Sequence, residues 1–352
     1  MIDFTPDTPP APLLAEIVRI YERAAARLRD IVLRVPGGPG AVYTRSRAAQ
    51  HLAQIDQVLA LLRQQAAAWT SAALEQALAQ GQADALRYLQ AMGLPQHALR
   101  PSFARFNSQA VSVLARDTAA DLAKAAGSMA DAAKTTLHRM QATGVSNAEV
   151  NQILSGRTII EGRPRLAIRE LRDALRAVHG KTVTIQSKHG PIEFKTGYYA
   201  EMVARTKTAQ ATIIANHETL CARGVDLVMI TGHITKYPCT AYVGKVFSLS
   251  GSNGRYPALA SLPGGGPPFH PNCSKYTVPW VTDLATPAQQ RHADPAPSTV
   301  GVSWKQLNDQ YDPALHKHIT VSEQKEIAAD IVSRARATGW TPTERVNPAL
   351  GG

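Results

Sequence analysis

The chain has 352 residues, 44% of them hydrophobic, so it is long enough for two or three domains with buried cores. Lysine and arginine number 38 against 27 acidic residues, and the formal net charge of +11 favours polyanionic partners such as nucleic acid or anionic lipid. No apolar run approaches the ~20 residues of a membrane span, and the first residues lack a signal-peptide pattern, so we expect a protein made in a cytoplasm. Three cysteines exclude a disulfide framework and leave metal binding, a single bridge or burial as their roles.

The first part of the chain has the pattern of long helices. Apolar residues recur at helical spacing from Pro12 to Val35, where a Pro/Gly run ends the stretch. An alanine-rich stretch extends from about Thr44 to Met92, with Gly81 as a candidate break, and another extends from about Asn107 to Thr143. Because small residues let helices approach closely, the sequence predicts an elongated bundle or a stack of helical hairpins.

Two shorter helices follow these long stretches. Ser146 and Glu149 have the spacing of a capping box, and the helix that they begin ends near Gly156. The second helix covers about Pro164 to Val178 and is strongly basic.

The arginines of this second helix, at three- and four-residue intervals, share one face. With two arginines that precede the helix, the set is Arg157, Arg163, Arg165, Arg169, Arg172 and Arg176. Two interpretations are open. The face is either solvated and partly neutralised by Glu170 and Asp173, or it contacts the DNA backbone.

After His179 the pattern changes from helical to mixed. Alternating residues in Lys181–Ser187 and Ile192–Phe194, separated by a turn, predict a β-hairpin. A helix from about Tyr198 to Ala222 and a buried strand from Val225 to Ile230 follow. The segment from Gly251 to Pro279 is rich in glycine and proline, so it needs something other than a regular ladder to order it.

These patterns predict an α+β protein with an elongated, mostly helical N-terminal region. A small α+β domain follows, with a β-hairpin, a helix, short strands and a Gly/Pro-rich loop. We divide the chain into a helical region (1–156), a basic linking helix (157–180), an α+β domain (181–283) and a Pro-rich segment with a helix and tail (284–352). The helix in the last segment is expected from about Ser322 to Thr338.

Four side chains that could bind a metal gather in the α+β domain: His233, Cys239, His270 and Cys273. The last two form a compact H-x-x-C pair. Two such pairs could close a tetrahedral zinc site and tie down a loop that does not order itself. The alternative is a contact or bridge between Cys239 and Cys273, with both histidines in ordinary hydrogen bonds.

Several sequence strings around these residues occur together in a specific order. They are Tyr199–Thr206, Gly224–Val228, His233, Cys239, Gly244–Gly251, Tyr256–Pro257 and Phe269–Cys273. On these strings, the segment from about Tyr198 to Pro279 resembles the phage minor capsid protein 2 family, which is related to Mu F-like head morphogenesis proteins. The N-terminal half resembles that family in helical character and position only.

This resemblance implies a minor component of a tailed-phage head, made in the host cytoplasm and present in few copies in the virion. It implies attachment near the portal vertex, with the portal protein and other head and neck proteins as partners. The expected role is head assembly, DNA packaging or DNA delivery, in an oligomeric state and with non-specific contact to phage DNA.

The chain departs from the family pattern at the cysteines. Relatives often carry a C-x2-C pair before the Gly-Lys-Val string and a further Cys or His after H-P-N-C. Here Lys236 stands at the first of those positions, and Ser274 and Lys275 follow Cys273. If the family site holds metal, this chain keeps part of it, with His233 as a substitute ligand.

Two other classes of function compete with this interpretation. A thiol-dependent enzyme would use Cys239 or Cys273 as the nucleophile and His270 as the base. However, His270 and Cys273 lie in one short turn, and such a pair more often orders a loop or binds a metal than catalyses a reaction. No G-x-S-x-G, Walker A or H-E-x-x-H motif is present. A regulatory DNA-binding protein is favoured by charge alone, without a recognisable recognition helix. We therefore expect a protein that is not an enzyme.

Overall fold

The computed structural model describes residues 11–33, 45–94, 108–155, 160, 163–179, 181–187, 190–295, 297–312 and 319–342. The chain divides into two compact units. The helical unit consists of Pro10–Ala73 and Ala115–Ala204, and the mixed unit consists of Met1–Pro9, Leu74–Leu114 and Arg205–Gly352. Each unit combines separate stretches of the chain. The four consecutive domains expected from the sequence stay a prediction.

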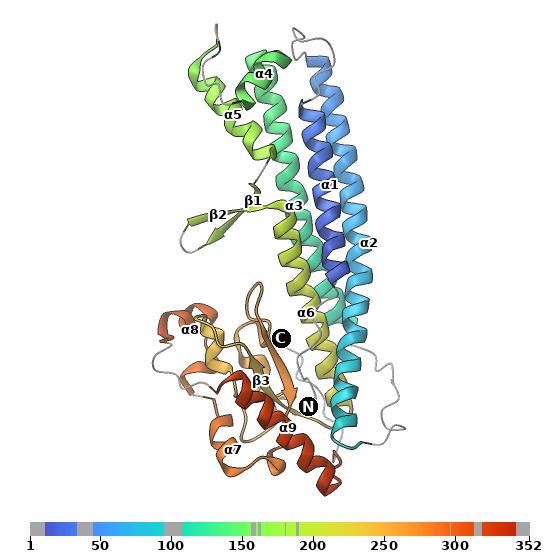
Figure 1. Cartoon of the computed structure of the whole chain (residues 1–352), viewed down its shortest axis with the longest axis vertical. Helices are drawn as coiled ribbons and strands as arrows, with labels where there is room; N and C mark the ends of the chain where they lie inside the picture. Colours follow the sequence, from blue (N-terminus) through green and yellow to red (C-terminus); the bar gives the residue numbers. More distant parts are fainter. Residues whose placement is uncertain are drawn as a thin grey trace. The chain divides into compact units, whose positions relative to one another are not determined.

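Three long helices contribute residues to both units. They are α2 (Arg45–Ala91), α3 (Ser108–Thr143) and α6 (Thr196–Ala222). In the helical unit, parts of these helices pack side by side with α1 (Ala11–Leu33) (Figure 1). The sequence pattern thus located each long helix to within a few residues.

The core of the helical unit combines alanines with large apolar residues. Ile17 of α1, Leu62 of α2 and Leu137 of α3 are fully buried there, as is Tyr21. The Tyr21 hydroxyl donates a hydrogen bond of 2.6 Å to the carbonyl oxygen of Leu122, so the buried polar group is satisfied. Burial of these side chains is the main stabilising contribution in this unit.

Two short helices and a hairpin complete the helical unit. Helix α4 (Asn147–Leu154) begins with the predicted capping box, in which the Ser146 side chain accepts from the Glu149 amide and the Glu149 side chain accepts from the Ser146 amide. Helix α5 (Arg165–His179) follows. The predicted hairpin is confirmed as antiparallel strands β1 (Lys181–Ser187) and β2 (Gly190–Lys195).

The mixed unit is built on a three-stranded antiparallel sheet. Strand β3 (Leu227–Gly232) lies between β4 (Val246–Ser248) and β5 (Lys275–Pro279). The central strand is the one that the sequence predicted, displaced by two residues. Its apolar residues, together with Phe247 and Trp280, form the centre of a second core.

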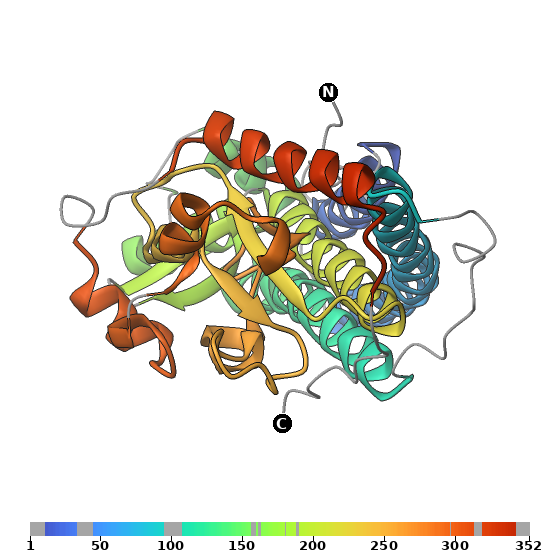
Figure 2. The ribbon, with the colours of Figure 1, turned by 90° about the horizontal axis from the view of Figure 1, so that it is seen from below.

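Short helices surround this sheet. They are the 3-10 helices η2 (Pro238–Tyr242), η3 (Leu259–Ser261), η4 (Pro263–Gly265), η5 (Thr282–Leu284) and η6 (Pro297–Thr299), and the α-helices α7 (Pro287–Ala293), α8 (Trp304–Gln310) and α9 (Val321–Thr338). The predicted C-terminal helix is confirmed as α9, which packs against β3 and η5 (Figure 2).

Helix α9 is joined to the sheet by one buried polar side chain. The Gln324 side chain accepts from the amide of Gly232 at 2.8 Å and donates to the carbonyl oxygen of the same glycine at 3.3 Å. This paired contact fixes the start of α9 at the end of β3, beside the segment that carries Cys239.

The expected α+β class is confirmed, and one prediction within it is wrong. Gly81 does not break α2, which continues as a helix to Ala91. The glycine instead permits close contact with α6 inside the mixed unit, because a β-carbon at this position would meet the backbone of Thr212. Among the described residues, no helix has both the length and the apolar character that crossing a bilayer requires.

Candidate metal centre and nucleic-acid interface

Cys239 is positioned by a tight loop after β3. The Thr240 hydroxyl donates to the carbonyl oxygen of Thr235 at 2.8 Å and accepts from the Thr235 amide at 3.1 Å, which closes the loop between them. Pro238 begins η2 with its fixed backbone angle. Cys239 follows it and is 1% exposed.

His270 and Cys273 lie in one turn immediately before β5. The Cys273 amide donates to the carbonyl oxygen of His270 at 3.0 Å. Asn272 adopts a left-handed backbone conformation with a φ of 58°, which asparagine tolerates better than most residues. Its side-chain oxygen accepts from Arg205 of α6 at 3.2 Å, so the turn is held from outside as well.

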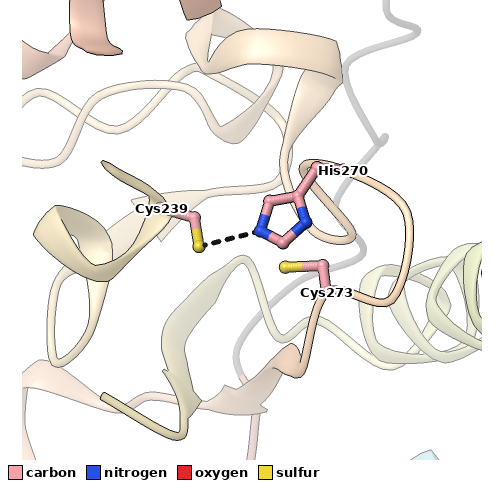
Figure 3. A group of neighbouring side chains, drawn as sticks. All are labelled: Cys239, His270 and Cys273. Atoms are coloured by element: carbon pink, nitrogen blue, oxygen red, sulfur yellow. Dashed lines mark hydrogen bonds between the residues drawn. The ribbon is translucent and has the colours of Figure 1, made fainter. Parts of the chain in front are cut away.

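The structure brings together three of the four predicted ligands. The sulfur atoms of Cys239 and Cys273 and a ring nitrogen of His270 all lie within 4.8 Å of one another, and the three side chains point toward a common centre (Figure 3). The Cys239 sulfur is 3.3 Å from Nε2 of His270. Both cysteines are free thiols, so no bridge joins them in this structure.

His233 is not part of this cluster. Its side chain is exposed, and its carbonyl oxygen accepts a hydrogen bond from the buried ammonium group of Lys275. The structure therefore does not bring His233 together with the other three candidate ligands, and its role as a ligand stays a prediction. Sequence reasoning also missed Lys275, whose burial nothing in its local sequence indicates.

The electrostatics of the cluster favour one thiolate. Hydrogen bonding with Cys239 lowers the pKa of the Cys273 thiol, as does hydrogen bonding with His270, although burial opposes this. The same contact with Cys273 raises the pKa of Cys239, as burial does. Burial also opposes protonation of His270, but hydrogen bonds to Cys273 and the Pro271 carbonyl outweigh it and raise its pKa. A deprotonated sulfur beside an imidazole is a soft metal-binding pair.

The basic helix α5 presents a second candidate site. Arg165, Arg169, Arg172 and Arg176 lie within about 60° of one another around the helix axis, since each residue advances by about 100°. We call these four residues the arginine stripe. A neighbouring face of α5 is buried in the core of the helical unit through Ile168, Leu171 and Leu175.

The two acidic residues of α5 each form one ion pair. Glu170 forms an ion pair of 2.9 Å with Arg139 of α3, and Asp173 pairs with Arg172 at 3.4 Å. The remaining stripe residues, Arg165, Arg169 and Arg176, are exposed and form no hydrogen bond or ion pair with any residue that the structure describes. Their charge is therefore available to a partner.

The two arginines before the stripe differ from it. Arg163 donates to the carbonyl oxygen of Gly144 at 2.8 Å and to Glu149 at 3.3 Å, so it ties the end of α3 to the start of α4. These bonds engage its guanidinium group within the helical unit, and its contact with DNA stays a prediction. Arg157 lies outside the described residues.

Comparison with known proteins gives one match. The sequence profile described as Phage minor capsid protein 2 matches residues 13–306, which includes the cluster, the arginine stripe and parts of both units. No curated protein and no solved structure matches the chain. Because the match covers most of the sequence, the chain belongs to the phage minor capsid protein 2 family.

Proposed function

We propose that this minor capsid protein works at the portal end of the phage head and contacts DNA there without reading its sequence. Membership of the family gives it a place in the virion and a role in the capsid. The observation that carries the proposal is the arginine stripe of α5, with three exposed guanidinium groups that have no partner among the described residues.

The stripe has the dimensions and chemistry of a contact to phosphates. From Arg165 to Arg176 the helix rises by roughly 16 Å, at about 1.5 Å per residue. Guanidinium groups along this length can each bind a phosphate and release its counterions, which supplies affinity without sequence preference. Helix α5 carries no Asn or Gln beside the stripe, the side chains that commonly read adenine.

The portal is the passage through which DNA enters a tailed-phage head. A minor component with a helix that binds phosphates acts most directly on that passage, in assembly, packaging or delivery. The proposed role involves no catalysis. His270 and Cys273 belong to one turn, and a third group, Cys239, shares their contact, which suits the ordering of a loop better than attack on a substrate.

Salt-dependent DNA binding tests the contact. The full-length chain and its Arg165→Gln/Arg169→Gln/Arg176→Gln variant are titrated by fluorescence anisotropy with two unrelated linear duplexes at several salt concentrations. Since each phosphate contact contributes about 0.9 to the slope of log affinity against log salt, the variant's slope should be less steep by about 3 per bound protomer. Both duplexes should bind equally.

A charge-matched control separates the stripe from net charge. Arg63 on α2, Arg291 on α7 and Lys305 on α8 are also exposed, and changing all three to glutamine removes the same formal charge. The control should keep the wild-type slope. An equal loss of slope in the control would remove the stripe from the proposal, and a preference of about tenfold or more for one duplex would favour the regulatory alternative.

A further inference from the structure

The cluster of Cys239, His270 and Cys273 has the donor chemistry of a zinc site. Thiolates and a neutral imidazole are the side chains that most often hold Zn²⁺, at about 2.3 Å from sulfur and about 2.0 Å from nitrogen. In a tetrahedron these bond lengths place sulfur and nitrogen about 3.5 Å apart. The separation of the Cys239 sulfur from His270 Nε2 is 3.3 Å, close to the value that a shared ion would impose on this pair.

His270 is oriented for coordination through Nε2. Its Nδ1 lies 2.9 Å from the carbonyl oxygen of Pro271, and because a carbonyl only accepts, Nδ1 must carry a proton. In the neutral ring, Nε2 then presents a lone pair toward the sulfur atoms. A backbone carbonyl on the other ring nitrogen is the usual support for a metal-bound histidine.

Two aromatic rings flank the imidazole. The ring of Tyr237 is centred 4.9 Å from that of His270, and the ring of Trp304 is centred 5.6 Å from it. With the carbonyl of Pro271, these contacts leave the His270 side chain little freedom to turn away. The His270 imidazole is thus positioned by its surroundings.

The three side chains come from two segments that the sheet places side by side. Cys239 follows the end of β3 at Gly232, and Cys273 precedes the start of β5 at Lys275, and these two strand ends are paired directly. An ion bound between them would clip the loop after β3 to the turn before β5. A glycine- and proline-rich turn gains most from such a clip, since binding energy then contributes to folding.

We propose that Cys239, His270 and Cys273 bind one zinc ion and that a water molecule is its fourth ligand in the isolated protein. Among the described residues, no further His, Cys, Asp or Glu joins the three within the same distance. The buried Lys275 is engaged by the carbonyl of His233, and the His233 ring lies outside the cluster. The inference is independent of DNA contact, because the arginine stripe belongs to the other unit.

Metal analysis of the full-length chain tests this inference. Protein purified without a tag or chelator should contain one zinc per chain by inductively coupled plasma mass spectrometry. After zinc removal, titration with Co²⁺ alone should give thiolate-to-cobalt absorption and the intense visible bands of a tetrahedral ion, both saturating at one equivalent. Cys239→Ser and Cys273→Ser should lose these bands.

Matched variants show whether the ligand set is right. Cys221→Ala removes the third cysteine, which is buried away from the cluster, and His233→Ala removes the excluded histidine. Both should bind cobalt as the wild type does. Loss of binding in His233→Ala would overturn the three-ligand site.

One further variant distinguishes the loss of a metal ligand from misfolding of the protein. His270→Cys should keep the metal and raise the thiolate-to-cobalt absorption by about half, because three sulfurs replace two. A cluster that only packs the loop would give no such gain. Absence of cobalt bands in folded wild-type protein, or full binding by folded Cys239→Ser, would sink the inference.

Discussion

Gly81 on α2 and Thr212 on α6 are in backbone contact within the mixed unit: a β-carbon on Gly81 would lie 2.0 Å from the carbonyl oxygen of Thr212. That oxygen cannot rotate away, so Gly81→Ala must push the two helices apart. We expect the variant to lose about 1–3 kcal/mol of stability, even though alanine is the better helix former. Urea unfolding followed by circular dichroism measures the change.

Gly127 provides the matched control for this substitution. It also lies inside a long helix, α3, but a β-carbon there would meet nothing within 4 Å. Gly127→Ala should therefore stabilise the protein by about 0.5–1 kcal/mol. If both alanine variants shift the unfolding midpoint in the same direction, close contact is not the reason for glycine at position 81.

Arg163 and Arg169 belong to the same basic stretch of sequence, yet their contacts in the structure differ. Arg163 is bonded to Glu149 and to the carbonyl of Gly144, whereas Arg169 belongs to the exposed stripe. Arg163→Gln should cost about 1 kcal/mol of stability and leave DNA binding unchanged. Arg169→Gln should leave stability unchanged within about 0.5 kcal/mol and reduce the salt slope of DNA binding by about 1.

Both variants are compared by urea unfolding and by the DNA titration described above. Exchange of the two outcomes, with Arg163→Gln affecting DNA binding and Arg169→Gln affecting stability, would contradict the assignment. The Glu149 carboxylate gives an additional check. Although burial opposes its ionisation, hydrogen bonds from Ser146 and Arg163 keep the pKa of Glu149 below its usual value, and Arg163→Gln should raise it.

We expect His217 of α6 to make the mixed unit sensitive to acid. Burial lowers its pKa to about 4, and its Nε2 lies 2.7 Å from the Thr277 hydroxyl on β5. In the unfolded chain the pKa returns to about 6.5, so the unfolded state binds more protons between these values. The contribution of His217 is complete above about pH 6.5 and declines as the pH falls toward 4.

Urea unfolding at pH 7 and pH 4.5 measures this effect. His217 should account for about 2–3 kcal/mol of the loss between the two values. His217→Gln keeps a polar group opposite Thr277 but does not titrate, so its loss should be smaller than that of the wild type by this amount. Equal losses in the two proteins would show that other groups cause the acid sensitivity.

Much of the fold follows from local signals. The 3.6-residue periodicity located the long helices, the capping box of Ser146 located α4, and alternation located the hairpin, because each depends on neighbours in sequence. Strand β4 has three residues, too few for any period to show. Strands β4 and β5 each form by pairing with β3, and this pairing joins residues that are far apart in the sequence. The role of Gly81 depends in the same way on Thr212, far along the chain.

The candidate metal site shows the same difference between local signals and long-range contacts. His270 and Cys273 are close in sequence and were recognisable as a pair, and Cys239 was one of the four candidate ligands. His233 lies outside the cluster, and the buried Lys275 is bonded to its carbonyl oxygen, neither of which the spacing indicates. The ring of Trp304 beside His270 comes from a helix that sequence patterns did not predict. Residue spacing therefore identified side chains that can bind a metal, and tertiary contacts determined which of them lie together in the cluster.

The proposed attachment to the portal protein can be measured directly. The purified full-length chain is mixed with the portal protein encoded by the same phage, and the mixture is analysed by size exclusion with light scattering at low and moderate salt. A stable complex of defined stoichiometry at both salt concentrations is the predicted result. Separate elution of the two proteins under both conditions would contradict portal attachment.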